Sequence, residues 1–214
     1  AAIESQGRAS PPSIERAFAR RCRATSNRQT AAAAEALSEA TFPQEGIWTI
    51  DAAGRVVAPG FIDVHTHARR GIFEVPTAEN YVRQGVTTLV EGQDGSSPLP
   101  LGAFLSKVEA LRPAVNFASL VGHGSVREAV MGRADRAPSA AELARMEGLV
   151  REAMREGAFG LSTGLFYVPG TFARTGEVIA LARVAGERGG IHVSHMRDEA
   201  AGVVASVLET IAIG

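Results

Sequence analysis

The sequence predicts an α/β fold, a partial (β/α)8 TIM barrel of about five strand–helix units, on two observations. Short apolar runs alternate with stretches of helical periodicity from Trp48 onward. Strands and helices that alternate in this way form parallel sheets with right-handed crossovers. A complete barrel needs eight units and typically about 250 residues, whereas five units are present here and only about 155 residues follow the first strand. The sequence therefore supplies roughly five-eighths of a barrel.

Each expected element has a defined place in the chain. The predicted strands are Gly60–His65, Thr87–Glu91, Asn116–Val121, Ala158–Ser162 and Ile191–Ser194. The predicted helices are Ala78–Gln84, Leu101–Leu111, Ala140–Glu156 and Gly176–Arg188, with another starting near Glu199. The third helix has the clearest limits, because Ser139 and Glu142 form a capping-box pattern and Gly157 follows its end.

The chain divides by composition into two expected domains. Residues 1–46 carry arginines and the alanine run Ala31–Ala34, with little apolar periodicity. They predict an irregular or partly helical segment, with a helix around Ala31–Ala40 favoured by propensity. Residues 47–214 predict the truncated barrel.

Composition excludes several classes of partner. A net charge of −1 offers no basic excess for nucleic acid. The sequence has no run of about 18 apolar residues and no signal peptide, so we expect no membrane contact and a cytoplasmic location. Cys22 is the single cysteine, which rules out a disulfide within the chain. Oligomeric state is left open.

The strongest chemical signal is His65-Thr66-His67, directly after the apolar run Pro59-Gly60-Phe61-Ile62-Asp63-Val64. Positions i and i+2 of a strand point to the same side, so both imidazoles are expected to enter one space. Two converging imidazoles at a strand end suit a zinc ion, and Asp63 could support them from deeper in the barrel. The alternative is a pair of surface histidines.

Four ordered motifs resemble the amidohydrolase superfamily, and within it the N-acyl-D-amino-acid deacylases (D-aminoacylases). The first motif is the His65-Thr66-His67 stretch with the apolar run before it. The second combines Gly85-Val86-Thr87-Thr88 with Gly92-Gln93-Asp94-Gly95, the third is Gly160–Gly170, and the fourth is His195-Met196-Arg197-Asp198-Glu199. The lead-in Ile50–Ala58 resembles the exit from the small β-sandwich domain of that superfamily. Residues 1–46 do not resemble the rest of that domain, and we describe them as a vestigial segment in its place.

The resemblance implies a zinc site with one or two ions. His65 and His67 match the paired first-strand histidines, and His195 matches the histidine ligand after the fifth strand. As an alternative, His195 and His192 are both strand histidines bonded within the fold, which we prefer for His192. Asp94 occupies the position where the family usually has a cysteine ligand, and a carboxylate can replace a thiolate on zinc. A turn aspartate without a metal role is the alternative.

A bridge between two metals needs a further ligand. Related hydantoinase-like enzymes use a carboxylated lysine from the fourth strand, but here that strand has none, and the single lysine, Lys107, lies in a predicted helix. Asp94 or Glu91 is therefore the natural source of a bridging carboxylate.

Three residues are candidates for substrate binding. Tyr167 matches a family tyrosine that holds substrate, with a core aromatic as the alternative. Arg197 can pair with a substrate carboxylate, although a salt bridge to Asp198 or Glu199 is the more usual arrangement. His123 follows the third strand, where it can touch substrate or be a loop histidine bonded to backbone.

The resemblance implies metal-dependent hydrolysis of the amide bond of N-acyl-D-amino acids, or of dipeptides with a C-terminal D residue. The general-base aspartate of the family follows the eighth strand, so the catalytic residue is unknown here. We expect this truncated form to be inactive and poorly folded, with an exposed sheet edge. The alternatives are another amidohydrolase-superfamily hydrolase, or a non-catalytic remnant of one.

Overall fold

The computed structural model describes residues 53–214. The chain divides into two units after Val57, and the second unit, Ala58–Gly214, is compact. The predictions for residues 1–46, including the helix around Ala31–Ala40, lie outside the described residues, so the predicted domain boundary stays a prediction. The second unit contains every strand and helix considered below.

The strands of the described residues form two parallel sheets. The first contains β1 (Phe61–Asp63), β2 (Val86–Glu91) and β3 (Asn116–Ser119), in that order. The second contains β4 (Val121–Gly122), β5 (Gly160–Gly164) and β6 (Ile191–His195). Neighbouring strands within each sheet are parallel, so the predicted α/β class with parallel strands is confirmed.

Only Leu120 separates β3 from β4, and this segment joins the two sheets. The Leu120 amide donates to the Glu91 carbonyl at 2.9 Å, and the Phe159 amide donates to the Ser119 carbonyl at 2.9 Å. One stretch of chain therefore passes from pairing with β2 to pairing with β5. As a result, the strands follow one another in space in the order in which they occur in the chain.

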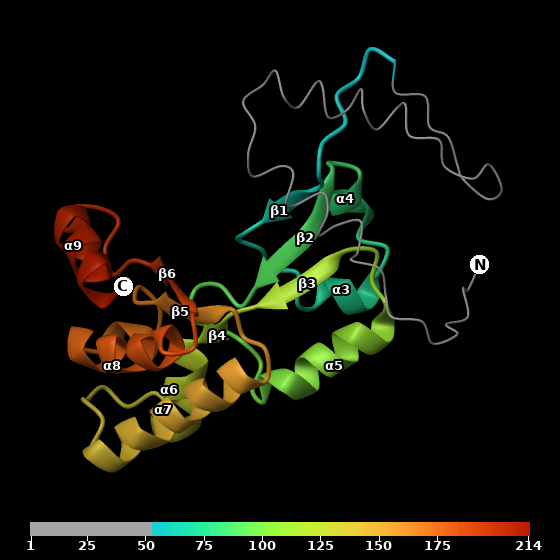
Figure 1. The fold of residues 1–214 in the computed structure, drawn as a ribbon. Coiled ribbons are helices and arrows are strands. Elements are labelled where there is room, and N and C mark those ends of the chain that lie inside the picture. Colours follow the sequence, from blue (N-terminus) through green and yellow to red (C-terminus); the bar gives the residue numbers. More distant parts are fainter. Residues whose placement is uncertain (1–52) are drawn as a thin grey trace. The chain divides into compact units, whose positions relative to one another are not determined.

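Helices connect the successive strands, and a final helix follows the last of them (Figure 1). The helices are α3 (Gly71–Glu74), α4 (Glu79–Val82), α5 (Leu101–Leu111), α6 (His123–Met131), α7 (Ala140–Arg155), α8 (Thr175–Gly186) and α9 (Val203–Ile213), with a 3-10 turn at Gly170–Phe172. α7 packs against α6 and α8, around a core that includes Met146, Val150, Leu161 and Leu181. Within the described part of the chain, no helix is long and apolar enough to cross a bilayer.

The predicted elements are present, with corrections to their number and bounds. The third predicted strand is interrupted at Leu120, and α3 and α6 were not predicted as helices. The sequence of α6 begins His123-Gly124-Ser125, which has low helix propensity. Burial of Val126 against the core favours the helix there, because tertiary packing outweighs a weak local preference.

The capping box at α7 provides a stability prediction. The Ser139 hydroxyl accepts the Glu142 amide at 3.3 Å, and the Glu142 carboxylate accepts the Ser139 amide at 2.8 Å. We expect Ser139→Ala to lower the free energy of unfolding by about 1 kcal/mol, since one helix-end amide loses its partner. Urea denaturation measures this loss. Ser106→Ala, at an exposed position within α5, is the control and should stay within about 0.5 kcal/mol of wild type. Equal values for the two variants would contradict the capping role.

Candidate metal centre

The two histidines of the His-x-His motif lie in a loop and not on the strand. β1 ends at Asp63, whose carboxylate accepts the His65 amide at 3.2 Å and turns the chain away from the sheet. The prediction that the strand continues to His65 is therefore wrong. The two side chains nevertheless converge, with ring centroids 5.4 Å apart and planes at 69°. Convergence was predicted from strand geometry, but a turn produces it.

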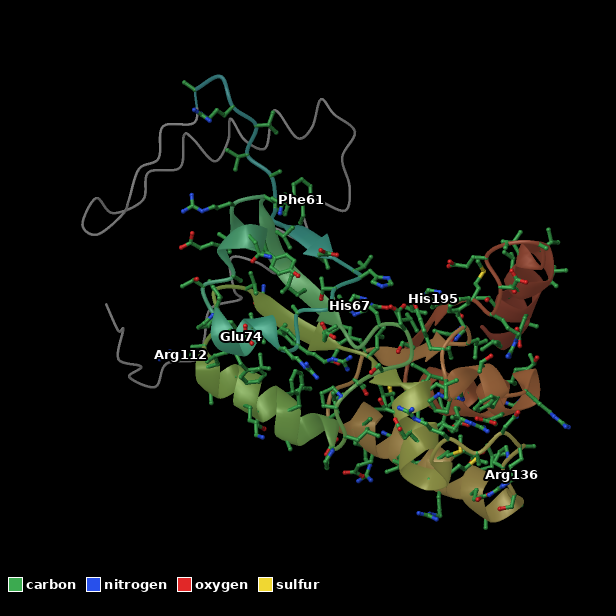
Figure 2. All side chains as sticks on the ribbon, turned by 180° about the vertical axis from the view of Figure 1, so that it is seen from behind. Phe61, His67, Glu74, Arg112, Arg136 and His195 are labelled. Atoms are coloured by element: carbon green, nitrogen blue, oxygen red, sulfur yellow. The ribbon has the colours of Figure 1, made fainter. Side chains whose placement is uncertain are left out.

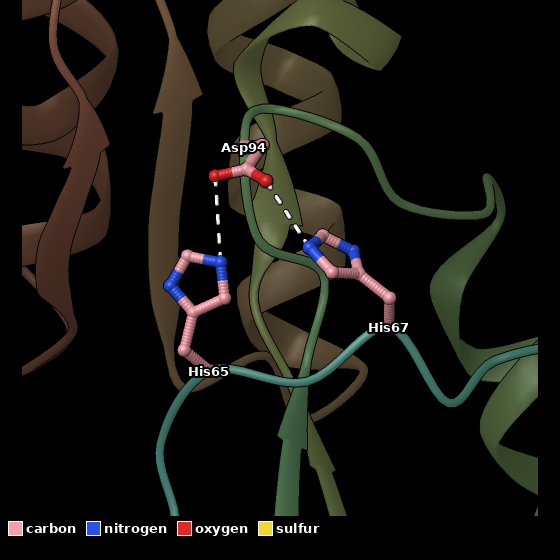
Figure 3. Close-up of side chains that lie close together, drawn as sticks. All are labelled: His65, His67 and Asp94. Atoms are coloured by element: carbon pink, nitrogen blue, oxygen red, sulfur yellow. Dashed lines mark ion pairs between the residues drawn. The ribbon is translucent and has the colours of Figure 1, made fainter.

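Asp94 lies between the two imidazoles (Figure 3). Its Oδ2 is 3.2 Å from His67 Nε2, and its Oδ1 is 3.6 Å from His65 Nε2. The residue has a left-handed backbone, with φ of 56°, which aspartate tolerates better than most residues. The ligand atoms of His65, His67 and Asp94 all lie within 4.8 Å of one another.

The loop that carries Asp94 lies directly against the second sheet. A Cβ atom at Gly164 of β5 would be 2.1 Å from the Asp94 carbonyl oxygen, so only glycine allows this approach. Gly95, next in the loop, has φ of 71° and donates its amide to the Ser162 hydroxyl at 3.1 Å. Glycines in both the loop and the strand thus hold Asp94 at the carboxyl end of β5.

His195 joins the same cluster from the other end of the chain. It ends β6, and its Nδ1 is 3.5 Å from Asp94 Oδ1, while its Nε2 is 3.6 Å from the Glu199 carboxylate. Figure 2 shows His67 and His195 reaching the same region from separate elements. Asp94 thus lies near nitrogens of His65, His67 and His195, while a metal ion shared by all three histidines stays a prediction.

The geometry and chemistry of this cluster fit a metal ion. Asp94 Oδ1 is buried and has no hydrogen bond among the described residues. Its imidazole neighbours stand 3.2 to 3.6 Å from the carboxylate oxygens. Two ligand atoms of one tetrahedral zinc ion, each about 2.0–2.1 Å from it, are separated by about 3.3 Å. Imidazole with carboxylate is also a donor set that zinc and similar ions accept.

Glu91 does not belong to the cluster. Its side chain is 0% exposed, and its Oε2 accepts the Arg69 amide at 3.2 Å. The group of ligand atoms close enough to share an ion, within the described residues, consists of His65, His67 and Asp94. Of the two carboxylates considered as bridging ligands, the structure brings only Asp94 to the histidines.

Tyr167 lies next to the cluster, and its role in substrate binding stays a prediction. Its ring centroid is 4.7 Å from that of His195, and the residue is 44% exposed. Tyr167, His67 and Asp94 also line a cavity of about 310 Å³, together with Arg69 and Glu128. Its volume is at the lower end of the range for small-molecule sites.

His123 and Arg197, the other substrate candidates, have partners elsewhere. His123 is fully buried in the first turn of α6, with its Nε2 2.9 Å from the Glu177 carboxylate, so neither the rim position nor a backbone bond is observed. Arg197 donates to both carboxylate oxygens of Glu209, at 3.0 and 2.9 Å, and to two backbone carbonyls. The expected partners of Arg197, Asp198 and Glu199, are thus replaced by a residue of α9.

The remaining sequence candidates lie where expected. His192 is on β6, with its Nε2 3.1 Å from the Thr163 hydroxyl, and burial lowers the pKa of its imidazole. This agrees with a strand histidine bonded within the fold. Lys107 is exposed on α5, away from the strand ends.

The contact between Arg197 and Glu209 makes stability depend on pH. Hydrogen bonds from Arg197 lower the pKa of the Glu209 carboxyl below its ordinary value. Because the folded pKa is the lower one, this contribution is complete above about pH 4.3 and is lost as the pH falls below that value. We expect Glu209→Gln to flatten the fall of unfolding free energy between about pH 5 and 3. Urea denaturation at a series of pH values measures this slope, and Glu187→Gln, at an exposed position, should leave it unchanged.

Parallel strands with a histidine and aspartate cluster at their carboxyl ends define an α/β protein with a metal-binding type of site. The chain belongs to the amidohydrolase family, whose pattern matches residues 49–211.

Several curated relatives and solved structures are deacylases of N-acyl-D-amino acids. The chain is 41% identical to an N-acyl-D-glutamate deacylase and 40% identical to a D-aminoacylase, both from Alcaligenes xylosoxydans xylosoxydans. The first match covers 77% of this chain and 38% of the relative, and the second covers 77% and 39%. The chain thus spans about two fifths of the length of these relatives.

The solved structures that are similar to this chain include deacylases of the same kind. The N-acyl-D-glutamate deacylase of Bordetella bronchiseptica, in complex with zinc and a phosphonate inhibitor, is 43% identical with a TM-score of 0.72. That match covers 77% of this chain and 39% of the solved chain. A D-aminoacylase studied for its binuclear metal centre is 36% identical with a TM-score of 0.68, over 73% of this chain and 38% of the other.

Proposed function

We propose that this chain is part of a zinc-dependent amidohydrolase that cleaves the amide bond of N-acyl-D-amino acids. The observation that carries the proposal is the convergence of His65, His67 and His195 on Asp94. Deacylases of N-acyl-D-amino acids among the relatives support the substrate class. We also propose that the strands seen here form the first part of a (β/α)8 barrel, which their chain-ordered arrangement supports.

The chain's own residues divide into two roles. His65, His67 and Asp94 would hold the metal, and His195, whose Nδ1 is 3.5 Å from Asp94 Oδ1, would be a further ligand. A bound zinc ion polarises a carbonyl and lowers the pKa of a water molecule towards about 7. Tyr167, beside His195, would hold the substrate by donating its hydroxyl to the acyl carbonyl or the carboxylate. The general base is not assigned to any residue of this chain.

Zinc binding and substrate preference test the proposal. Purified chain should bind zinc with at least one ion per chain, measured by metal analysis after gel filtration. Hydrolysis is assayed on the chain alone and on the chain extended by the coding sequence that follows residue 214. We expect the extended form to cleave N-acetyl-D-amino acids and spare their L isomers, and the chain alone to show no turnover. Absence of bound zinc, or preference for L isomers, would overturn the proposal.

A further inference from the structure

Two neighbouring loops carry the metal-binding side chains, and polar contacts join these loops independently of any metal. The histidine loop, Val64–Arg69, contains His65 and His67. The aspartate loop, Gly92–Ser96, contains Asp94. Because one ligand set is shared between two segments, the spacing of the loops determines how well a metal ion fits between them.

Arg69 contacts both sides of this junction. Its guanidinium donates through Nη1 to the Ser96 carbonyl at 3.1 Å and to the Ser96 hydroxyl at 3.0 Å. Its backbone amide donates to Glu91 Oε2 at 3.2 Å, and its Nε lies 3.9 Å from Glu91 Oε1. One residue of the histidine loop is thus bonded to the residue before the aspartate loop and to the residue that ends it.

Further bonds fix the histidine loop at two earlier positions. The Gln93 side chain, 1% exposed, donates to the Val64 carbonyl at 2.6 Å. The Thr66 amide donates to the Val90 carbonyl at 3.1 Å. His65 therefore lies between two anchored residues, and His67 lies between anchored Thr66 and Arg69.

The burial of Glu91 explains why Arg69 matters most. A fully buried carboxylate is costly unless it is paired, and Arg69 is its ion-pair partner among the described residues. Glu91 Oε1 has no hydrogen bond there, so the pair depends on the amide bond and on the nearby guanidinium. Loss of the guanidinium would leave the Glu91 carboxylate without a counter-ion, in contact with the backbone of the histidine loop.

We propose that Arg69 and Glu91 are positioning residues that set the distance between the His67 imidazole and the Asp94 carboxylate, and with it the metal affinity. This inference rests on the proposed metal centre. It gives Glu91 a role that differs from direct ligation, since it acts through Arg69 and the loop backbone.

The test compares metal binding by folded variants. Zinc affinity is measured by competition with a chromophoric chelator, and the ligand geometry by visible absorption of the cobalt(II)-loaded chain. We expect Arg69→Met and Glu91→Ala to lower zinc affinity by about 10–100-fold and to change the cobalt spectrum. Glu91→Gln keeps an acceptor for the Arg69 amide, so its loss should be smaller than that of Glu91→Ala.

A matched control separates this effect from loss of an ordinary ion pair. Glu79, the first residue of α4, and Arg83, directly after its end, form an exposed pair at 2.9 Å. Glu79→Gln should leave zinc affinity within twofold of wild type. Arg69→Lys keeps a positive charge near Glu91 but loses the planar guanidinium. It provides a second test of Arg69 if the Arg69→Met variant does not fold. We expect it to lose about 10-fold in affinity.

The outcomes distinguish this inference from the proposed function. A wild-type chain that binds no zinc overturns both. A wild-type chain that binds zinc, with folded Arg69→Lys and Glu91→Ala variants of equal affinity and unchanged cobalt spectrum, overturns the positioning role alone. Circular dichroism of each variant establishes that the comparison is made between folded proteins.

Discussion

Replacing Asp94 with alanine is expected to lower the zinc affinity of the chain by at least about 100-fold, more than the loss of a residue that only supports a ligand. The reason is its central place in the cluster. Its two oxygens lie 3.2 to 3.6 Å from nitrogens of His65, His67 and His195, so one substitution removes a contact to each of these three histidines. The same chelator competition that measures the loop variants measures this loss.

Two further variants show whether charge or shape is needed at this position. Asp94→Asn preserves the shape but removes the charge that a zinc ligand supplies, so it should bind nearly as weakly as the alanine variant. Asp94→Cys should bind zinc more tightly than the alanine and asparagine variants, because a thiolate is a zinc ligand. The D-aminoacylase family that the sequence resembles usually has a cysteine at this position. Asp135→Ala, at an exposed position beyond α6, is the control. Wild-type affinity in Asp94→Ala would show that the aspartate is a turn residue without a metal role.

Glu177→Gln is expected to destabilise the fold by about 3–5 kcal/mol, the largest effect on stability that we predict. Glu177 and Arg127 form an ion pair in which both side chains are almost fully buried. Burial by itself raises the pKa of the Glu177 carboxyl, but the hydrogen bonds from His123 and Arg127 lower this pKa by more than burial raises it. The net pKa is below the ordinary value, so the carboxylate is charged at neutral pH. Removing that charge leaves the Arg127 guanidinium buried without its counter-ion.

A double variant shows whether the loss of stability in Glu177→Gln comes from losing the ion pair or from leaving the Arg127 charge uncompensated. Arg127→Met combined with Glu177→Met removes both charges, and its unfolding free energy should be closer to wild type than that of Glu177→Gln. Urea denaturation measures all three proteins. A loss of less than about 1 kcal/mol in Glu177→Gln, the value of an exposed pair, would contradict the importance of burial.

Much of the fold was predictable because its signals are local. Apolar runs between helical stretches predicted β2, β5 and β6 within a few residues, and α5 was predicted with its observed bounds. The capping box at Ser139 predicted the start of α7. α6 was missed, because its first turn contains glycine and serine and only burial against the core stabilises it.

Part of the candidate site was likewise predictable from local sequence, and part was not. The histidines and the aspartate loop were recognisable from motifs, because residue type and short spacing are properties of the sequence. The choice of Asp94 over Glu91 was not, since it depends on a left-handed turn and on the close approach of Gly164 to the loop. Nor did the sequence indicate that His123 and Arg197 bond to Glu177 and Glu209, more than ten residues away in each case.

The sequence by itself therefore determined most of the strands and helices, in their order, and the identity of the chemical groups at the strand ends. The tertiary structure alone decided which of these groups meet, and which are held by a carboxylate elsewhere. The physical reason is that secondary structure and motif chemistry depend on neighbours within a few residues. The meeting of His67, Asp94 and His195 depends instead on backbone packing between segments far apart in the chain.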